Sequence, residues 1–342
     1  MVRPDRHTIF ALSVLATALL AACGERGPTE YRLSGPTMGT SFSVAVVATT
    51  AFDREALQAR IDGTLDDVDR HMSTYRPDSE LVAFNDSEST DWIPVSRELC
   101  AAVEAALDFS RMSGGVFDIT VGPLVNLWGF GPDGSRTEPP DDATIEETRL
   151  TTGWRKLHTD CARPAMRKDT GTVRVDLSGF AKGLAADELA ALLDESGLDN
   201  YLVEIGGELR VRGLNADAMH WRIAIERPDE LGRSIAQIIQ VSDVAVATSG
   251  DYRNYFEYAG RRYSHTIDPR TGRPVTHNLA SVSVIAERAA DADALATALM
   301  VLGPEAGPAF AEANRISAYF LLRNGNEFSE MTSSRFPAVQ DQ

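Results

Sequence analysis

One stretch in the middle of the chain, Val173–Glu195, constrains the fold more than any other. It begins with the β-branched run Val173-Arg174-Val175, which predicts a buried strand that ends at Asp176. A Ser-Gly turn follows, and we expect a helix from Ala181 because apolar residues then recur at helical spacing. A strand that turns directly into a helix leaves free backbone N–H groups at the turn, where a phosphate group could bind.

Lys182 lies in the first turn of this predicted helix. The positive end of a helix dipole favours a carboxylate at that position over an ammonium group. The mismatch indicates that the Lys182 ammonium group serves a ligand and not the helix. The alternative is an ordinary strand, turn and helix with a solvated lysine, and this stretch alone does not decide between the two.

Composition describes an acidic globular protein. The 342 residues suffice for one large domain or two, and 43% hydrophobic with 24% charged residues is ordinary for a globular chain. The formal net charge of −17 makes nucleic acids and anionic membrane surfaces poor candidate partners. The acidic residues are spread along the chain, which favours a solvated surface as their explanation.

The first 22 residues are expected to be a targeting segment. Arg3 and Arg6 precede the apolar run Ile9–Leu20, which is too short to span a bilayer as a mature helix. The segment Leu20-Ala21-Ala22-Cys23 resembles a bacterial lipoprotein cleavage box, which implies cleavage before Cys23 and lipidation of its thiol. We therefore expect a protein anchored on the periplasmic side of the inner or the outer membrane. The alternative is an ordinary signal peptide.

Two further cysteines, Cys100 and Cys161, follow Cys23. An oxidising compartment would allow a disulfide between them, but the sequence alone does not place them together. Neither has C-x-x-C spacing and the histidines are scattered, so a zinc enzyme is not expected.

Strands and helices mix along the chain without regular βαβ alternation, which predicts an α+β fold. Residues 23–34 are expected to form a linker, Ser41–Ala48 an alternating strand, and 35–335 the folded domain. The expected helices are Arg54–Met72, Ser96–Ser110 with Ser96 as N-cap, Thr144–Leu150, Asp291–Leu302 and Ala306–Asn314. Further strands are expected at Tyr201–Ile205, Glu208–Gly213, Trp221–Glu226, Ile235–Val241, Val244–Thr248 and Ala280–Ala286, with a final hairpin around Asn324-Gly325.

Two glycine-rich segments need a separate judgement. Gly129–Gly134 matches G-x-G-x-x-G, but no clear strand precedes it and prolines follow it, so we do not interpret it as a dinucleotide site. Gly114-Gly115 comes just before Phe117 and Asp118. This pair either lets the backbone approach a flat ligand closely or ends a helix.

A second informative stretch is Ala290–Leu299. Asp293 and Thr297 are four residues apart, so they share one face of the predicted helix. A carboxylate and a hydroxyl group on one face suit a hard cation such as Mg²⁺. The alternative is an acidic residue that stabilises the helix start beside a buried threonine.

Seven short motifs occur in order along residues 31–335. They are Met38-Gly39-Thr40, Met72-Ser73-Thr74-Tyr75, Gly115-Val116-Phe117-Asp118, Asp176–Gly183, Thr248–Arg253, Ser264–Pro269 and Asp293–Thr297. Their order resembles the ApbE family, whose members are FAD:protein FMN transferases and often periplasmic lipoproteins. The resemblance implies a single large catalytic domain of α+β class, with the mixed sheet and helices of the ApbE fold, which is related to the T-fold.

The resemblance also implies an FAD site. The positions that would line the adenine and ribose end of FAD are Met38, Tyr75, Val116, Phe117 and Asp118. Further FAD contacts would come from Asp176, Lys182 and Ile267.

A Mg²⁺ site beside the FAD diphosphate is implied in the same way, with Asp293, Thr297 and the backbone carbonyl of Gly179 as ligands. Some family members carry a second aspartate just before this threonine. This chain has Ala296 there, so a single side-chain carboxylate is committed to the ion. Phosphate or water would complete the shell.

The implied reaction transfers FMN from FAD to a threonine hydroxyl of an acceptor flavoprotein through a phosphoester bond, with AMP as the leaving group. His265 is our candidate for accepting the hydroxyl proton, because histidine titrates near neutral pH; Asp251 could act similarly. Alternatively, His265 is bonded to the strand backbone and Asp251 caps its turn. We expect the acceptor to be a periplasmic or membrane redox protein. Hydrolysis of FAD to FMN and AMP, and FAD storage without catalysis, stay open as alternatives.

Overall fold

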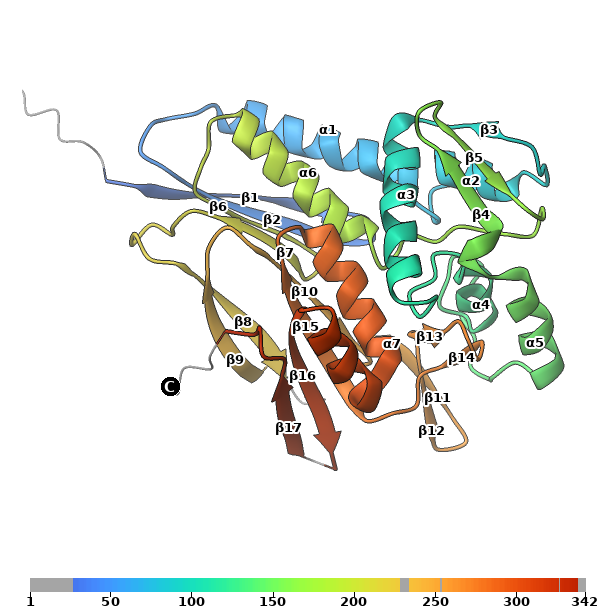
Figure 1. Ribbon diagram of the computed structural model, residues 1–342. Coiled ribbons are helices and arrows are strands. Elements are labelled where there is room, and N and C mark those ends of the chain that lie inside the picture. The colour runs from blue at the N-terminus through green and yellow to red at the C-terminus, as the bar shows by residue number, and fades with distance from the viewer. Residues whose placement is uncertain (1–26, 228–233, 253, 326, 338–342) are drawn as a thin grey trace, which may run out of the picture.

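An eight-stranded antiparallel sheet forms the centre of the protein in the computed structural model (Figure 1). The structure describes residues 27–227, 234–252, 254–325 and 327–337, so the predicted signal peptide and Cys23 lie outside the described residues. In spatial order the strands are β1 (Thr29–Thr37), β2 (Thr40–Ala48), β6 (Tyr201–Ile205), β7 (Glu208–Arg212), β10 (Ala245–Gly250), β15 (Leu279–Ala286), β16 (Ser317–Asn324) and β17 (Glu327–Thr332).

The two faces of the sheet are covered differently. Helices α1 (Arg54–Met72), α6 (Ala181–Glu195) and α7 (Ala289–Ala313) cover one face, and the hairpin of β8 (Trp221–Arg227) and β9 (Ser234–Val241) packs on the other. Successive side chains of a strand point to opposite faces. In β2, Val44 and Val46 pack on the helical side, whereas Ala45 and Val47 pack beneath β8–β9. All four are buried, so the expected strand is present but its expected alternation is wrong.

The folded domain begins earlier than predicted. Residues 29–34 belong to β1, which pairs with β2 from Thr29 opposite Ala48 to Thr37 opposite Thr40. They are therefore strand and not linker. β1 is an edge strand in which Leu33 is the one fully buried side chain, so its sequence lacks the apolar alternation by which strands are recognised.

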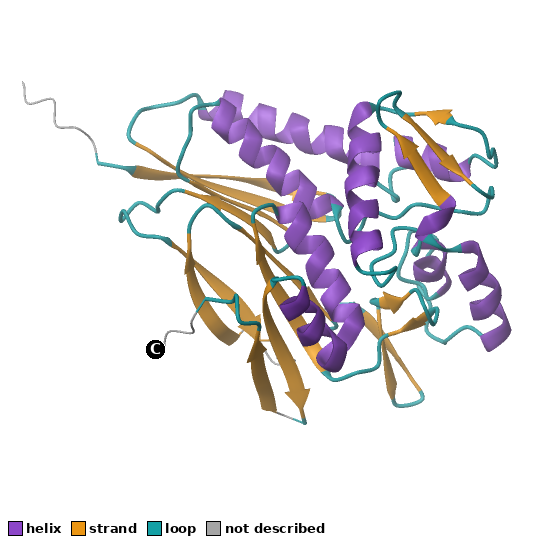
Figure 2. Ribbon diagram, in the orientation of Figure 1, coloured by secondary structure: helices purple, strands orange, loops and turns teal. Residues whose placement is uncertain are grey.

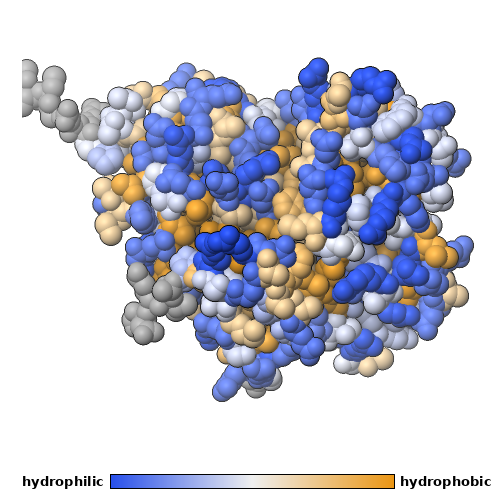
Figure 3. Space-filling model, in the orientation of Figure 1, coloured by the Kyte–Doolittle hydropathy of each residue, from blue (hydrophilic) through white to orange (hydrophobic). Residues whose placement is uncertain are grey.

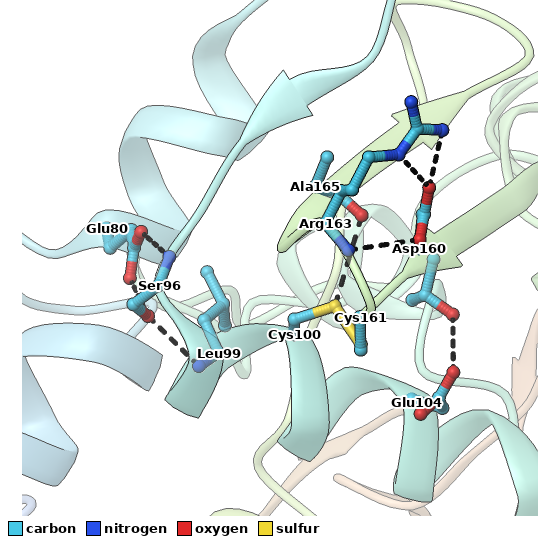
Figure 4. Close-up of a disulfide and its surroundings, with 10 residues drawn as sticks. Glu80, Ser96, Leu99, Cys100, Glu104, Asp160, Cys161, Arg163 and Ala165 are labelled. Atoms are coloured by element: carbon cyan, nitrogen blue, oxygen red, sulfur yellow. Dashed lines mark hydrogen bonds and ion pairs between the residues drawn. A yellow bond between two sulfur atoms is a disulfide. The ribbon is translucent and has the colours of Figure 1, made fainter.

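A second group of elements packs beside the sheet and its helices (Figure 2). It contains α2 (Glu80–Asp86), α3 (Arg97–Met112), α4 (Gly122–Leu127), α5 (Asp142–Thr151) and the small sheet β3 (Ile93–Pro94), β5 (Ala165–Lys168) and β4 (Leu157–Asp160). A disulfide joins Cys100 on α3 to Cys161 in the turn between β4 and β5, with the Cα atoms 5.7 Å apart (Figure 4). Two short hairpins complete the fold: β11 (Tyr255–Tyr258) with β12 (Arg261–Ser264), and β13 (Ile267–Asp268) with β14 (Arg273–Pro274).

For the stretch Val173–Glu195, one of the two predicted elements is confirmed. The helix from Ala181 is confirmed as α6, but Val173–Asp176 is not a strand. Val173 and Val175 are buried, yet a side-chain amide takes the place of a neighbouring strand. Asn85 donates to the Val175 carbonyl at 2.8 Å and accepts from the Val175 N–H group at 2.7 Å.

Most other predicted elements are confirmed, including α1, α3 with its Ser96 cap, α5 and the final hairpin. The two helices predicted after Asp291 are the two halves of α7, which breaks at Gly303, where φ is 76°. By length and composition α7 could cross a membrane, but half of its most apolar window is buried, as in a core helix. Hydrophilic residues cover most of the face seen in Figure 3, and hydrophobic ones show mainly in a band across its middle.

Candidate active site

A cavity of about 810 Å³ lies where the β7, β10 and α6 termini meet α7 and the loop that follows α3. It collects most of the predicted site residues. Those that line it are Tyr75, Val116, Phe117, Asp118, Asp176, Gly179, Lys182, His265, Ile267, Asp293 and Thr297. Together with Thr40 and Thr248, which also line it, residues from all seven sequence motifs therefore meet around one space.

Asp293 is buried on α7, at the N-terminal end of α6. Its Oδ2 atom accepts a hydrogen bond from the Gly183 N–H group at 3.3 Å, and the Lys182 Nζ atom lies 3.8 Å away. The carboxylate that the α6 dipole favours is thus supplied by another helix. Burial raises the pKa of Asp293 to about 7, while the Lys182 charge acts in the opposite direction. The Gly183 N–H group and the Lys182 ammonium group thus both favour the charged form of Asp293 against its burial.

Thr297 and Gly179 adjoin Asp293 in the cavity wall. The Thr297 Oγ1 atom lies 3.2 Å from the Ser249 Oγ atom. A Cβ atom added at Gly179 would lie 3.1 Å from Thr297 Oγ1, so the glycine lets its backbone come close to that hydroxyl group. All three predicted Mg²⁺ ligands thus line the same cavity, and we refer to Asp293, Thr297 and Gly179 together as the oxygen corner. Oxygen donors of this kind suit a hard cation.

Within the described ranges, no three His, Cys, Asp or Glu residues form a group that could hold a metal ion by themselves. An ion at the oxygen corner would thus depend on hydroxyl, backbone and ligand oxygens in addition to Asp293. This agrees with Ala296, which is buried in the core beside Thr297 and offers no second carboxylate.

Lys182 projects into the cavity, where its Nζ atom donates to the Glu208 Oε1 atom at 2.8 Å. Its partners are carboxylates, which the sequence argument did not foresee. Glu208 is 5% exposed, and its Oε2 atom has no hydrogen-bond partner among the described residues. The signal for Glu208 was the preceding pair Gly206-Gly207, whose φ angles of 62° and 111° form the tight β6–β7 turn at the cavity.

His265 has a defined hydrogen-bonding state. Its Nδ1 atom lies 3.0 Å from the Asn254 carbonyl oxygen, and its backbone N–H group donates to the same oxygen at 3.1 Å. A carbonyl oxygen only accepts, so Nδ1 carries the proton and the lone pair is on Nε2. Burial lowers the pKa of His265 and keeps the ring neutral near pH 7. His265 can therefore be bonded to the backbone through Nδ1 and still accept a proton at Nε2.

Asp251 does not line the cavity, contrary to its prediction as a catalytic residue. Both of its carboxylate oxygens accept hydrogen bonds from the Arg323 guanidinium group, at 3.1 and 3.2 Å. The carboxylate is committed to this buried ion pair, so the structure does not bring it to a reacting hydroxyl group.

Met38 also lies away from the cavity lining. It occupies the two-residue turn between β1 and β2 with Gly39, at φ angles of 46° and 71°. Its side chain packs against the hydrophobic core, and Thr40 and Ser41 line the cavity instead. The prediction that Met38 contacts FAD is not supported by this arrangement.

The loop after α3 forms another wall. Asp118 accepts hydrogen bonds from the Thr120 N–H group at 2.8 Å, the Thr120 hydroxyl at 2.6 Å and the Trp154 N–H group at 3.0 Å. Burial raises the pKa of Asp118, and these donors oppose the shift. Gly115 ends α3 by donating to the Ser110 carbonyl at 2.8 Å, so the helix-end alternative for Gly114-Gly115 is confirmed.

Tyr75 is 62% exposed and donates from its hydroxyl group to the Phe130 carbonyl oxygen at 3.2 Å. It therefore stands at the edge of the cavity. Asp176 accepts from the Ser178 N–H group at 2.8 Å and shapes the turn into α6, and Ile267 is buried on β13.

Comparison with known proteins gives consistent matches. The model of the ApbE family matches residues 38–320. An FAD:protein FMN transferase of Vibrio cholerae is 45% identical over 326 residues, covering 95% of this chain and 97% of that relative. The solved flavin transferase ApbE of Vibrio cholerae has a TM-score of 0.85 at 43% identity, covering 92% of this chain and 100% of that one. The apo flavinyl transferase ApbE of Pseudomonas stutzeri has a TM-score of 0.83 at 39% identity, covering 90% and 96%.

Proposed function

The chain belongs to the ApbE family, and from this premise we propose that it is a Mg²⁺-dependent FAD:protein FMN transferase. It transfers the FMN half of FAD to a threonine hydroxyl group of a second protein, and AMP leaves. One observation carries the proposal: a single cavity contains both the oxygen corner of Asp293, Thr297 and Gly179 and the His265 ring, whose Nδ1 atom lies 3.0 Å from the Asn254 carbonyl oxygen.

The donor set of the oxygen corner fits a hard cation. The Asp293 carboxylate, the Thr297 hydroxyl group and the Gly179 carbonyl group would hold Mg²⁺, with water and the phosphate oxygens of FAD completing its shell. Once bound, the ion neutralises negative charge on the diphosphate that is cleaved. The Lys182 ammonium group adds positive charge at the same end of the cavity.

His265 takes up the proton of the nucleophile. Its Nε2 lone pair accepts the threonine hydroxyl proton while the hydroxyl oxygen forms a bond to the phosphorus of the FMN half. The bond between that phosphorus and the bridging oxygen breaks, and AMP leaves with the bridging oxygen. Because the Asn254 carbonyl group fixes the Nδ1 proton, the ring needs no tautomer change before the step.

The remaining cavity residues are proposed to bind FAD. Tyr75, Val116, Phe117 and Asp118 would contact its adenine and ribose end, and Asp176 and Ile267 would add further contacts. This assignment is supported by their common position on the cavity wall.

We also propose that the protein is exported and anchored to a membrane through a lipid on Cys23, and that its acceptor is a periplasmic or membrane redox protein. The disulfide between Cys100 and Cys161 supports export, because such bonds persist in oxidising compartments.

The test is to incubate the protein lacking its leader with FAD and Mg²⁺, with and without an acceptor that a known transferase modifies. AMP release and the intact mass of the acceptor are followed together. We expect an FMN-sized mass gain that disappears in the Asp293→Ala variant. AMP without a mass gain would indicate a hydrolase, and bound but uncleaved FAD would contradict the proposal.

A further inference from the structure

The proposed reaction gives no role to the buried carboxylate of Asp251, which follows the cavity-lining Gly250 in the chain. The residue is 8% exposed, and burying a charge is costly unless it is paired. Its partner is Arg323 on β16, which donates one hydrogen bond to each carboxylate oxygen. The pair joins the end of β10 to a strand 72 residues further along the chain.

The backbone of Asp251 is fixed as well. Its N–H group donates to the Ala280 carbonyl group on β15 at 3.1 Å, and its carbonyl oxygen accepts from the Arg262 guanidinium group on β12 at 3.1 Å. Asp251 thus connects the main sheet, through β10, β15 and β16, with the β11–β12 hairpin. The hairpin itself forms a separate two-stranded sheet in the described chain.

Both chain segments that hold His265 start from this connection. Three residues after Asp251, the Asn254 carbonyl oxygen accepts hydrogen bonds from the backbone N–H and Nδ1 of His265. Three residues before His265, the Arg262 guanidinium group donates a hydrogen bond to the Asp251 carbonyl oxygen. His265 is therefore linked to Asp251 through Asn254 and through Arg262, and no hydrogen bond between the Asp251 and His265 side chains occurs among the described residues.

We propose that the Asp251–Arg323 ion pair is a positioning device for His265, which fixes the tautomer and the place of the imidazole ring relative to the oxygen corner. The inference deepens the proposed function and rests on it for the role of His265. It also gives Asp251 a function other than proton transfer. Catalytic groups need such support because a misplacement of about 1 Å can reduce a rate about 100-fold.

The first test is spectroscopic and uses the ligand-free protein with ¹⁵N-labelled histidine. In the wild-type chain we expect the His265 signals of a single tautomer with the proton on Nδ1. In Asp251→Asn and in Arg323→Gln we expect a mixture of tautomers, because the Asn254 carbonyl group is no longer held in place. An unchanged single tautomer in both variants would overturn the proposal.

The second test is kinetic. We expect kcat for FMN transfer to fall about 10- to 100-fold in both variants, with KM for FAD changed less than about threefold, because the FAD-binding wall is untouched. Arg323→Lys keeps the charge and should restore part of kcat. In a His265→Gln background, Asp251→Asn should cause no further loss, whereas a fully additive loss would show that Asp251 acts elsewhere.

The matched control is Arg273→Gln. Arg273 forms an exposed ion pair with Asp142 at 2.8 Å and lies on β14, outside the cavity lining, so tautomer and kcat should both stay as in the wild type. Thermal unfolding identifies any variant that does not fold. If Asp251→Asn or Arg323→Gln fails to fold, the result of the other variant tests the proposal. If the wild-type chain transfers no FMN, the proposed function fails, while the tautomer measurement still tests the ion pair.

Discussion

Asp293 is the residue on which the oxygen corner depends most. It supplies the one side-chain carboxylate of the corner, and its contacts with the Gly183 N–H group and the Lys182 Nζ atom are both made by the Oδ2 atom. We expect Asp293→Asn to lower FAD cleavage at least about 100-fold, because an amide oxygen binds Mg²⁺ much more weakly than a carboxylate. The measurement is AMP release across a Mg²⁺ titration.

The control for Asp293→Asn is Asp291→Asn, two residues away on the same helix. Asp291 is half-buried and does not line the cavity, and its Oδ1 atom lies 3.9 Å from the Arg288 Nη1 atom. We expect its substitution to leave the Mg²⁺ dependence unchanged. Equal activity of Asp293→Asn and Asp291→Asn at every Mg²⁺ concentration would remove Asp293 from the metal site.

His265 should determine how transfer responds to acid. Burial lowers its pKa below the ordinary histidine value of about 6.5, so Nε2 keeps its lone pair at pH 7 and is protonated only at lower pH. We expect kcat/KM for transfer to be level near neutral pH and to fall with a midpoint below pH 6.5. His265→Gln should be slower throughout and lack this acidic limb. A midpoint above pH 7 would contradict the assignment.

At the scale of elements, the crossing of α6 and α7 brings Lys182 and Asp293 together. A Cβ atom at Gly183 would lie 2.3 Å from the Ala289 carbonyl oxygen, so only glycine allows this approach. We expect Gly183→Ala to lower the free energy of unfolding by about 3 kcal/mol, near the upper end for overpacking, and to weaken FAD cleavage by displacing Asp293. Chemical denaturation and AMP release measure the two effects.

Gly63→Ala is the matched control for Gly183→Ala. Gly63 is exposed within α1, and a Cβ atom there would meet nothing within 4 Å. We expect this substitution to stabilise the protein by about 0.5–1 kcal/mol, because alanine loses less backbone entropy in a helix. The free energy of unfolding should thus fall in Gly183→Ala and rise in Gly63→Ala.

Helices and strands could be predicted from the sequence where apolar spacing and capping residues within the element determine its structure. The helix Arg54–Met72 and the Ser96 cap follow from apolar spacing and N-cap chemistry, and the structure has both. The segment Val173–Asp176 looks like a strand in sequence. It is not one, because its partner is the side chain of Asn85, about 90 residues away, which no local pattern indicates.

The site shows the same limit. Asp293 and Thr297 could be grouped in advance because helical spacing places them on one face. Glu208 and the partner of Asp251 could not, because both depend on how distant strands align: Lys182 meets Glu208 across 26 residues, and Asp251 meets Arg323 across 72. The motifs indicated which residues gather, and the fold decided which of them face the cavity.

At the scale of the whole molecule, the cavity lies between two groups of elements with different contents. The sheet and its helices contribute the oxygen corner and Lys182, whereas the helical group around α3 contributes Val116, Phe117 and Asp118. FAD that reached from one wall to the other would contact both groups. Their relative placement is therefore part of the active site.

The disulfide between Cys100 and Cys161 is a covalent link within the helical group around α3, which we call the α3 group. Its removal tests how much the stability of this group depends on the link. Cys100 and Cys161 close a segment of 61 residues that includes Val116–Asp118. Cross-linking a segment of this length restricts the unfolded chain, so we expect the double variant Cys100→Ala/Cys161→Ala to lose about 2–4 kcal/mol of unfolding free energy. Denaturation with and without a reducing agent measures this: the agent should destabilise the wild-type chain by a similar amount and leave the double variant unchanged. A wild-type chain insensitive to reduction, once its thiols are shown to be free, would mean that packing alone holds the α3 group against the sheet.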